Sequence, residues 1–221
     1  MTMKRDNFKK ACIANIIVFL LEFFSISWMM SGISSGILSV AGLRALKFFT
    51  VDSNIYLGIA SLIAAVAYYR AIKEKQKDIP SFIYLLKLSA TSAVTITFLV
   101  TVFFLEPTMG RLYGYLILFA YSNFFLHLVN PLAAVITWLA YERNSSLSLK
   151  SVFLAMIPTV LYVIYYVVEV ITHTRNGIIM PGYDWYGFFA LSLKSAIIIL
   201  PLFLLFTFLV CFVLYRLGIN R

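Results

Sequence analysis

The 221-residue sequence is poor in charge: Asp, Glu, Lys and Arg make up 12% of it, about half the share in an average soluble protein. Hydrophobic residues make up 62%. A soluble domain of this size could not cover its surface with so few polar side chains. The composition therefore excludes a soluble globular enzyme and a disordered protein. Two cysteines, Cys12 and Cys211, exclude a disulfide scaffold, and what is left is a polytopic membrane protein.

Six segments are long and apolar enough to cross a bilayer core, which takes about 20 helical residues. The first follows a basic N-terminal segment, but it is long and no A-x-A cleavage site follows it, so we interpret it as an uncleaved span. The sequence predicts an all-α protein with six transmembrane helices in a single integral-membrane domain, residues 1–221. The predicted spans are 12–31, 49–70, 82–105, 115–140, 151–171 and 187–215.

The basic residues are distributed unevenly between the two ends of these spans. There are 18 of them against 9 acidic residues, a balance that would suggest nucleic-acid binding in a soluble protein. Twelve fall on the side of the two termini, two fall within spans, and four fall on the other side: Arg44, Lys47, Arg111 and Arg175. The positive-inside rule then places both termini in the cytoplasm. We attribute the charge to topology and expect no nucleic-acid partner.

Polar residues at membrane depth are the candidate functional residues, because they are costly to bury in lipid. The first cluster lies at the outer end of the second span, in LKFFTVDSN (46–54). If the helix runs through it, Thr50, Ser53 and Asn54 share one face, and Asp52 points elsewhere. One interpretation is a helix N-cap, in which Thr50, Asp52 or Ser53 satisfies free backbone N–H groups. The other is a reactive or binding site.

The second cluster lies in the fourth span, in SNFFLHLVNPLAAV (122–135). Asn123, His127 and Asn130 recur at helical spacing and project from one side. Pro131 has no N–H, so we expect a kink and a His127 carbonyl that needs another donor. A neutral histidine that joins helices by hydrogen bonds is one interpretation. A catalytic or ligand-binding histidine is the other.

Three further features are candidates. Glu169 and His173 are four residues apart near the outer end of the fifth span, where they could form a simple pair or an acid/base partner. They fall short of the three protein ligands that a zinc site needs, so we predict no metal. Glu22 is a lone carboxyl in the first span. Trp185 belongs to MPGYDWYG (180–187), either an interfacial aromatic belt or the rim of an outward-facing pocket.

Thr50 and His127 would form the smallest catalytic unit if their side chains meet. A threonine hydroxyl needs a base, and a neutral histidine can take its proton and later protonate the leaving alcohol. Asn54 or Asn130 could donate an N–H to the oxyanion. The predicted boundaries, however, put His127 about 18 Å below the outer start of its span, deeper than Thr50. A meeting requires the second span to begin inside the bilayer, or the fourth to start later.

The segments KFFTVDSN (47–54) and FLHLVNPLAAVITWL (125–139), with His127 placed 77 residues after Thr50, resemble a known pattern. They are similar to the androgen-induced and androgen-dependent membrane hydrolase family and its bacterial relatives, and so is the loop PGYDWY. The animal members hydrolyse fatty acid esters of hydroxy fatty acids with a threonine and a histidine. The resemblance implies that Thr50 is the nucleophile and His127 the base. Thr137 departs from the pattern, since bacterial relatives often have an acidic residue there.

These observations favour a cofactor-free hydrolase of lipid esters in the membrane, with a pocket open to the outer side and a substrate that enters laterally from lipid. The short loops fit a bacterial plasma membrane. The alternative is a non-catalytic transporter or lipid-binding protein, which predicts a continuous polar path or no pocket. A metal hydrolase built on Glu169 and His173 is a third hypothesis. The candidates for substrate or oxyanion contacts are Ser53, Asn54, Asn123, Asn130, Glu169, His173 and Trp185.

Overall fold

Uninterrupted runs of Leu, Ile, Val, Phe and Ala form helices that satisfy their own backbone hydrogen bonds, as a chain inside a bilayer must. The computed structural model describes residues 5–33, 40–142, 146–189 and 193–219. Six helical spans in it are long and apolar enough to cross a membrane, which confirms the prediction of an all-α polytopic membrane protein. The spans are Asp6–Met30, Phe49–Lys73, Ser81–Tyr113, Ser122–Tyr141, Lys150–Thr172 and Ala196–Gly218.

Several spans are built from more than one helical segment, because 3₁₀ and π-helical turns interrupt or join the α-helices. In chain order the elements are α1 (Arg5–Met30), η1 (Gly42–Lys47), α2 (Phe49–Lys73), α3 (Ser81–Val100), η2 (Thr101–Leu105), α4 (Glu106–Tyr113), η3 (Ile117–Phe119), α5 (Ser122–Phe124), η4 (Phe125–Val129), α6 (Asn130–Tyr141), α7 (Lys150–Ala155), α8 (Ile157–Thr172), β1 (Thr174–Arg175), β2 (Ile178–Ile179) and α9 (Leu193–Gly218). The third span thus joins α3, η2 and α4, and the fourth joins α5, η4 and α6. The two short strands form an antiparallel hairpin outside the bundle.

Three predicted boundaries differ from the structure. The sixth span was predicted to begin at residue 187, but α9 begins at Leu193 and residues 187–189 are not helical. The fourth span begins at Ser122 instead of residue 115, because Gly114 and Leu116 take positive φ angles of 101° and 68° and break the helix before it. The segment 106–114, predicted as an outer loop, instead continues the third span as α4. Pro107 lies in the first turn of α4, where its missing N–H is tolerated.

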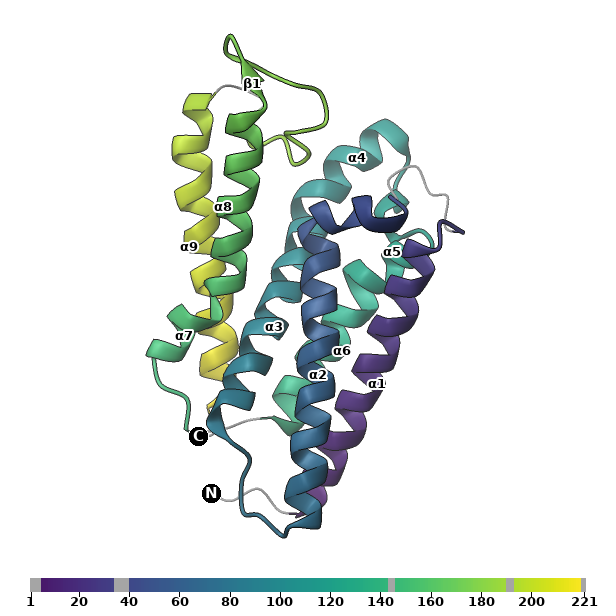
Figure 1. Cartoon of the computed structure of the whole chain (residues 1–221), viewed down its shortest axis with the longest axis vertical. Coiled ribbons are helices and arrows are strands. Elements are labelled where there is room, and N and C mark those ends of the chain that lie inside the picture. The colour runs from purple at the N-terminus through teal and green to yellow at the C-terminus, as the bar shows by residue number, and fades with distance from the viewer. Residues whose placement is uncertain (1–4, 34–39, 143–145, 190–192, 220–221) are drawn as a thin grey trace.

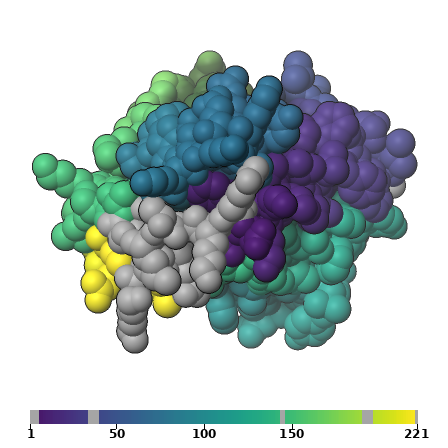
Figure 2. All heavy atoms as spheres, turned by 90° about the horizontal axis from the view of Figure 1, so that it is seen from below, coloured from purple at the N-terminus to yellow at the C-terminus, as the bar shows by residue number. Residues whose placement is uncertain are grey.

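The helices form two groups that separate toward the outer end. Figure 1 shows α1, α2, α3 and α6 side by side, while α8 and α9 form a pair that diverges from α3 and α4. Seen from below, α9 (yellow) lies on the side of the bundle away from α1 (purple) in Figure 2. The first and last helices begin and end at the same end of the bundle (Figure 1), as an even number of spans requires.

Large apolar side chains point away from the bundle along most spans. Examples are Phe23 on α1, Ile59 on α2, Leu161 on α8 and Leu205 on α9, each of which is more than half exposed. In water such a surface would drive aggregation, whereas lipid tails solvate it without cost. The exterior is therefore that of an integral membrane protein.

Buried polar side chains join α1, α2, α3 and α6 near their inner ends. Lys87 donates a 2.9 Å hydrogen bond to Ser61 Oγ and lies 3.7 Å from a carboxylate oxygen of Glu142, which also accepts a 2.7 Å hydrogen bond from Asn15. The side chains of Lys87 and Glu142 are only 1% and 0% exposed. Burial raises the pKa of the Glu142 carboxyl, and the Lys87 ammonium opposes this effect. We call Asn15, Ser61, Lys87 and Glu142 the inner cluster.

We expect Glu142→Ala to lower the free energy of unfolding by about 3–5 kcal/mol, because it leaves the Lys87 ammonium buried without its carboxylate. Equilibrium unfolding in mixed micelles measures this change. Glu74→Ala, which removes an exposed carboxylate at the inner end of α2, is the control and should change stability by less than about 0.5 kcal/mol. Replacing both charges, with Lys87→Met and Glu142→Leu, should recover most of the loss. A double variant as unstable as Glu142→Ala would contradict this role.

Candidate active site

The structure brings Thr50 and His127 together. Thr50 is the second residue of α2, and His127 lies at the centre of η4. The Nε2 atom of His127 is 3.3 Å from the Oγ1 atom of Thr50. The late start of the fourth span makes this possible, since His127 follows Ser122, the first residue of that span, by only five positions. The depth mismatch implied by the predicted boundaries therefore disappears.

The other ring nitrogen of His127 defines the chemistry of the pair. Its Nδ1 atom lies 3.0 Å from the carbonyl oxygen of Leu118, which can only accept a hydrogen bond. Nδ1 therefore carries the proton, and in a neutral ring Nε2 presents a lone pair. The hydroxyl of Thr50 donates to that lone pair. This is the arrangement in which a histidine can act as a general base toward a hydroxyl.

A widened helical turn positions His127. In η4 the N–H of Asn130 bonds to the carbonyl of Phe125, five residues back instead of four. Pro131 follows and has no N–H. The carbonyl of Leu126 is thus left without a backbone donor, and Nδ2 of Asn54 donates to it at 3.2 Å. The sequence predicted a carbonyl in need of another donor at His127, and the structure shows a side-chain donor at the neighbouring carbonyl of Leu126.

Asn54 and Asn130 form a second polar cluster with Glu22 and Ser25, which we call the outer cluster. Nδ2 of Asn54 also donates to the Thr50 carbonyl at 2.6 Å. Nδ2 of Asn130 lies 2.7 Å from Glu22 Oε2, 2.9 Å from Ser25 Oγ and 3.2 Å from Asn54 Oδ1. The partner of Glu22, which the sequence left open, is therefore Asn130. The hydrogen bonds of these two amides join α1, α2 and α6. Either amide could donate to an oxyanion only if it gave up one of these hydrogen bonds.

The N-cap interpretation of the first cluster is wrong. The N-cap residue of α2 is Phe48, which makes no side-chain capping hydrogen bond. The Oγ atom of Ser53 instead bonds to Thr97 Oγ1 at 3.1 Å and to the Thr50 carbonyl at 3.1 Å, which joins α2 to α3. The structure therefore gives Thr50 a histidine as its side-chain partner, with no capping role.

Asn123 is buried in α5, one turn before His127.

An aromatic loop before α9 covers the start of α2. The N–H of Phe49 donates to the hydroxyl of Tyr186 at 2.9 Å. Tyr162 on α8 donates to the Lys47 carbonyl at 2.6 Å and accepts a 3.1 Å hydrogen bond from Nε1 of Trp185. Burial raises the pKa of Tyr186 to about 12, so its hydroxyl stays neutral. These contacts correspond to the rim interpretation of residues 180–187.

A small apolar cavity lies next to Thr50, between α2, α3, α8 and α9. Tyr186 and Phe188 line it from the aromatic loop, and threonine and tyrosine hydroxyls are the polar groups in an otherwise apolar lining. The apolar lining is formed by Phe49, Ile96, Val100, Leu105, Val163, Phe188 and Phe203. This mostly apolar lining is of the kind that contacts aliphatic groups.

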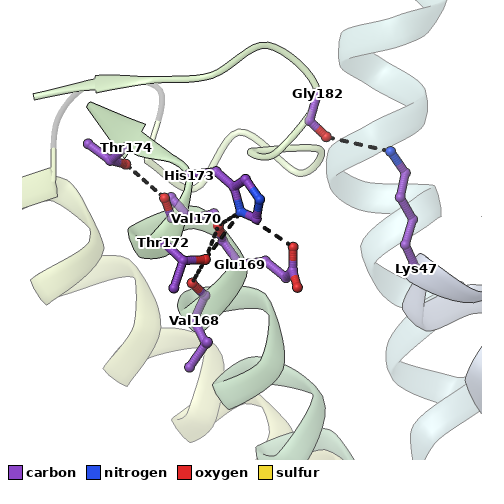
Figure 3. A network of polar contacts seen from close by, with 8 residues as sticks. All are labelled: Lys47, Val168, Glu169, Val170, Thr172, His173, Thr174 and Gly182. Carbon is purple, nitrogen blue, oxygen red and sulfur yellow. Dashed lines mark hydrogen bonds and ion pairs between the residues drawn. The ribbon is translucent and has the colours of Figure 1, made fainter. Parts of the chain in front are cut away.

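Glu169 and His173 are not brought to the Thr50–His127 pair. Figure 3 shows them at the outer end of α8, where Nδ1 of His173 lies 3.6 Å from Oε2 of Glu169. The imidazole also stacks on Tyr183 at 3.6 Å. Each of the two side chains is about one third exposed. Across residues 5–33, 40–142, 146–189 and 193–219, no group of three or more His, Cys, Asp or Glu could hold a metal ion.

Sequence reasoning missed Glu106. This residue begins α4 and is 8% exposed. Its carboxylate accepts the backbone N–H of Leu116 and, at 3.2 Å, that of Leu118. Leu118 is the residue whose carbonyl orients His127. An acidic residue that ends an apolar run was a visible signal, but its partners are backbone groups in an irregular loop that no residue pattern predicts.

Known proteins do not supply a family for this site. Comparisons of the chain with protein-family models, with curated proteins and with solved structures found no match in any of the three. The interpretation of the site therefore depends on its geometry: a threonine hydroxyl, a histidine with a defined tautomer and an apolar cavity beside them.

Proposed function

We propose that the chain is an integral-membrane lipid-ester hydrolase with Thr50 as the nucleophile and His127 as the general base. One observation carries the proposal: the 3.3 Å approach of His127 Nε2 to Thr50 Oγ1, in a ring whose Nδ1 is engaged by Leu118. A nucleophile and its base lie within about 2.6–3.2 Å in active enzymes, and slightly farther apart before substrate binds. The resemblance to the androgen-induced and androgen-dependent membrane hydrolases supports the same two roles.

The reaction follows from the geometry. Nε2 of His127 takes the hydroxyl proton while Oγ1 of Thr50 attacks the ester carbonyl carbon. The tetrahedral intermediate expels the alcohol, which receives the proton from Nε2 and leaves an acyl ester on Thr50. A water molecule, deprotonated by Nε2, then attacks that ester. The fatty acid is released and Oγ1 regains its proton, so the enzyme returns to its starting state.

The cavity beside Thr50 favours an ester with a long aliphatic acyl chain. Apart from threonine and tyrosine hydroxyls its lining is apolar, and it is formed by residues of α8 and α9 together with residues of α2 and α3. An acyl chain placed there would set its carbonyl next to Oγ1. Fatty acid esters of hydroxy fatty acids, the substrates of the family that the sequence resembles, fit this description. Because its loops are short, we propose that the protein lies in a bacterial plasma membrane.

The second candidate is a non-catalytic transporter or lipid-binding protein. Its support is the line of buried polar groups formed by the inner cluster and by Glu22, Ser25, Asn54 and Asn130. Asn15, Glu22 and Asn130 each have a buried side-chain oxygen without a partner among the residues that the structure describes. However, no hydrogen bond within those residues joins Ser61 of the inner cluster to Glu22 of the outer one. The contact between His127 and Thr50 favours the hydrolase over this alternative.

Hydrolysis of a series of acyl esters by protein in liposomes tests the proposal. We expect wild type to cleave long-chain esters, with release of the free fatty acid. Val163 is 8% exposed and lines the cavity. We expect Val163→Phe to lower kcat/KM for long-chain esters by about tenfold or more, because the larger ring occupies space that the chain needs. A short-chain acetyl ester should react almost normally.

Val168→Phe is the matched control, since Val168 is on the same helix but 51% exposed on its outer surface. It should leave hydrolysis of both ester lengths unchanged. An equal loss on short and long esters in Val163→Phe would contradict the placement of the acyl chain. Wild-type protein that binds lipid but cleaves no ester would favour the non-catalytic alternative.

A further inference from the structure

We infer that Glu106 is a positioning residue that holds His127 in the tautomer needed by a general base, acting through the backbone of Leu118. For its catalytic meaning this inference rests on the proposed function. Its structural content, a carboxylate that determines which nitrogen of a buried imidazole carries the proton, can be tested separately.

The carboxylate of Glu106 fixes the loop before the fourth span. It accepts two backbone N–H groups, from Leu116 and Leu118, and hydrogen bonds to an ionised carboxylate are stronger than those between neutral groups. Leu116 has a φ of 68°, a left-handed conformation that is uncommon for a residue with a side chain and that costs energy unless its surroundings hold it. The two hydrogen bonds from this loop to Glu106 supply that restraint.

Leu118 transmits this restraint to the histidine. Its N–H is held by Glu106 at 3.2 Å, and its carbonyl accepts the Nδ1 proton of His127 at 3.0 Å. A loop that moved would take this carbonyl away from the ring. The imidazole could then carry its proton on Nε2, where it would no longer accept the hydroxyl proton of Thr50.

The close fit of the loop against α4 is a separate observation for the same conclusion. Gly110 lies one turn after Glu106 on α4. A Cβ atom at Gly110 would be 3.1 Å from the ring of Tyr115 and 3.6 Å from Oε1 of Glu106. The missing side chain thus lets the loop approach the carboxylate. The ion pairs found within the described residues do not involve Glu106.

The chain has only two histidines, which makes the tautomer measurable. In a His173→Gln background, ¹⁵N-histidine labelling in nanodiscs gives NMR signals from His127 alone. We expect the protonated nitrogen to be Nδ1 when Glu106 is present. In Glu106→Gln, an isosteric change that removes the charge and one acceptor oxygen, we expect signal from the Nε2–H tautomer to appear.

The same variants are compared in their rate of reaction with a fluorophosphonate probe. Glu106→Gln should lower the maximal labelling rate by about 10- to 100-fold, as is common when a group that orients a functional histidine is removed. The probe concentration at half-maximal rate should not change, because the cavity is intact. Glu106→Asp keeps the charge and should recover part of the rate, which a general loss of folding would not allow. Glu169→Gln, the same substitution in the half-buried pair with His173, is the control and should change neither readout.

The outcomes separate this inference from the proposed function. Glu106→Gln protein that keeps the Nδ1–H signal and the wild-type labelling rate would overturn the inference and leave the hydrolase intact. A tautomer change in protein that is never labelled at Thr50 would support the inference and overturn the hydrolase. If Glu106→Gln does not fold, Glu106→Asp decides, because its shorter side chain places the carboxylate farther from the loop. A lowered labelling rate with some Nε2–H signal would support the inference, and wild-type values of both would overturn it.

Discussion

Thr50→Ala is expected to abolish labelling by a fluorophosphonate probe and to lower ester hydrolysis by about 1,000-fold or more. The hydroxyl that donates to Nε2 of His127 is the group that would become acylated, and alanine has nothing to replace it. Loss of the nucleophile in comparable enzymes leaves only the rate due to binding and charge stabilisation. The measurements are labelling in membranes and fatty acid release from a long-chain ester.

Two controls make the Thr50 result specific. Thr50→Ser keeps a hydroxyl at the same position and should retain labelling. Thr172→Ala removes an exposed hydroxyl at the outer end of α8 that bonds to its own helix, and it should behave as wild type. Labelling that persists in Thr50→Ala would show that another side chain is the nucleophile.

His127→Gln should lower the maximal rate of hydrolysis by about 1,000- to 10,000-fold, because glutamine cannot accept the proton of Thr50. The change should appear in kcat and not in KM. The imidazole of His127 is not among the side chains that line the cavity, so its loss should leave substrate binding unchanged. Steady-state kinetics on one long-chain ester measures both constants.

His173→Gln is the matched control, since it makes the same substitution in the half-buried pair with Glu169, away from Thr50. It should leave both constants near the wild-type values. A His127→Gln enzyme within about tenfold of wild type would assign the base to another group and reduce His127 to a structural link between Thr50 and Leu118.

The helical architecture could be predicted because hydropathy alone determines it: a run of about 20 apolar residues in lipid must be a helix. All six spans were found in this way. The start of the fourth span could not, since it depends on positive φ angles at Leu116 and Tyr121, and neither residue is a type that favours that conformation. The continuation of the third span through Glu106 and Pro107 could not be predicted either, because the residue types in this segment are also common in loops.

The central pair of the site could be predicted from residue types, whereas its supporting contacts could not. Thr50 and His127 stood out as polar residues where lipid makes polarity costly. The π turn at His127 and the bond from Asn54 to Leu126 depend on a register shift in the backbone, which side-chain spacing does not reveal. Glu106 likewise acts on backbone N–H groups, which every residue except proline has, so no sequence pattern identifies its partners.

Localising the adduct that a fluorophosphonate probe forms with the wild-type protein in membranes would test the proposed chemistry most directly. Intact mass gives the number of adducts, and mass spectrometry of peptides gives the residue. We expect one adduct per chain, on Thr50, that does not form in His127→Gln. An adduct on a different residue, or none on folded protein, would contradict a threonine hydrolase.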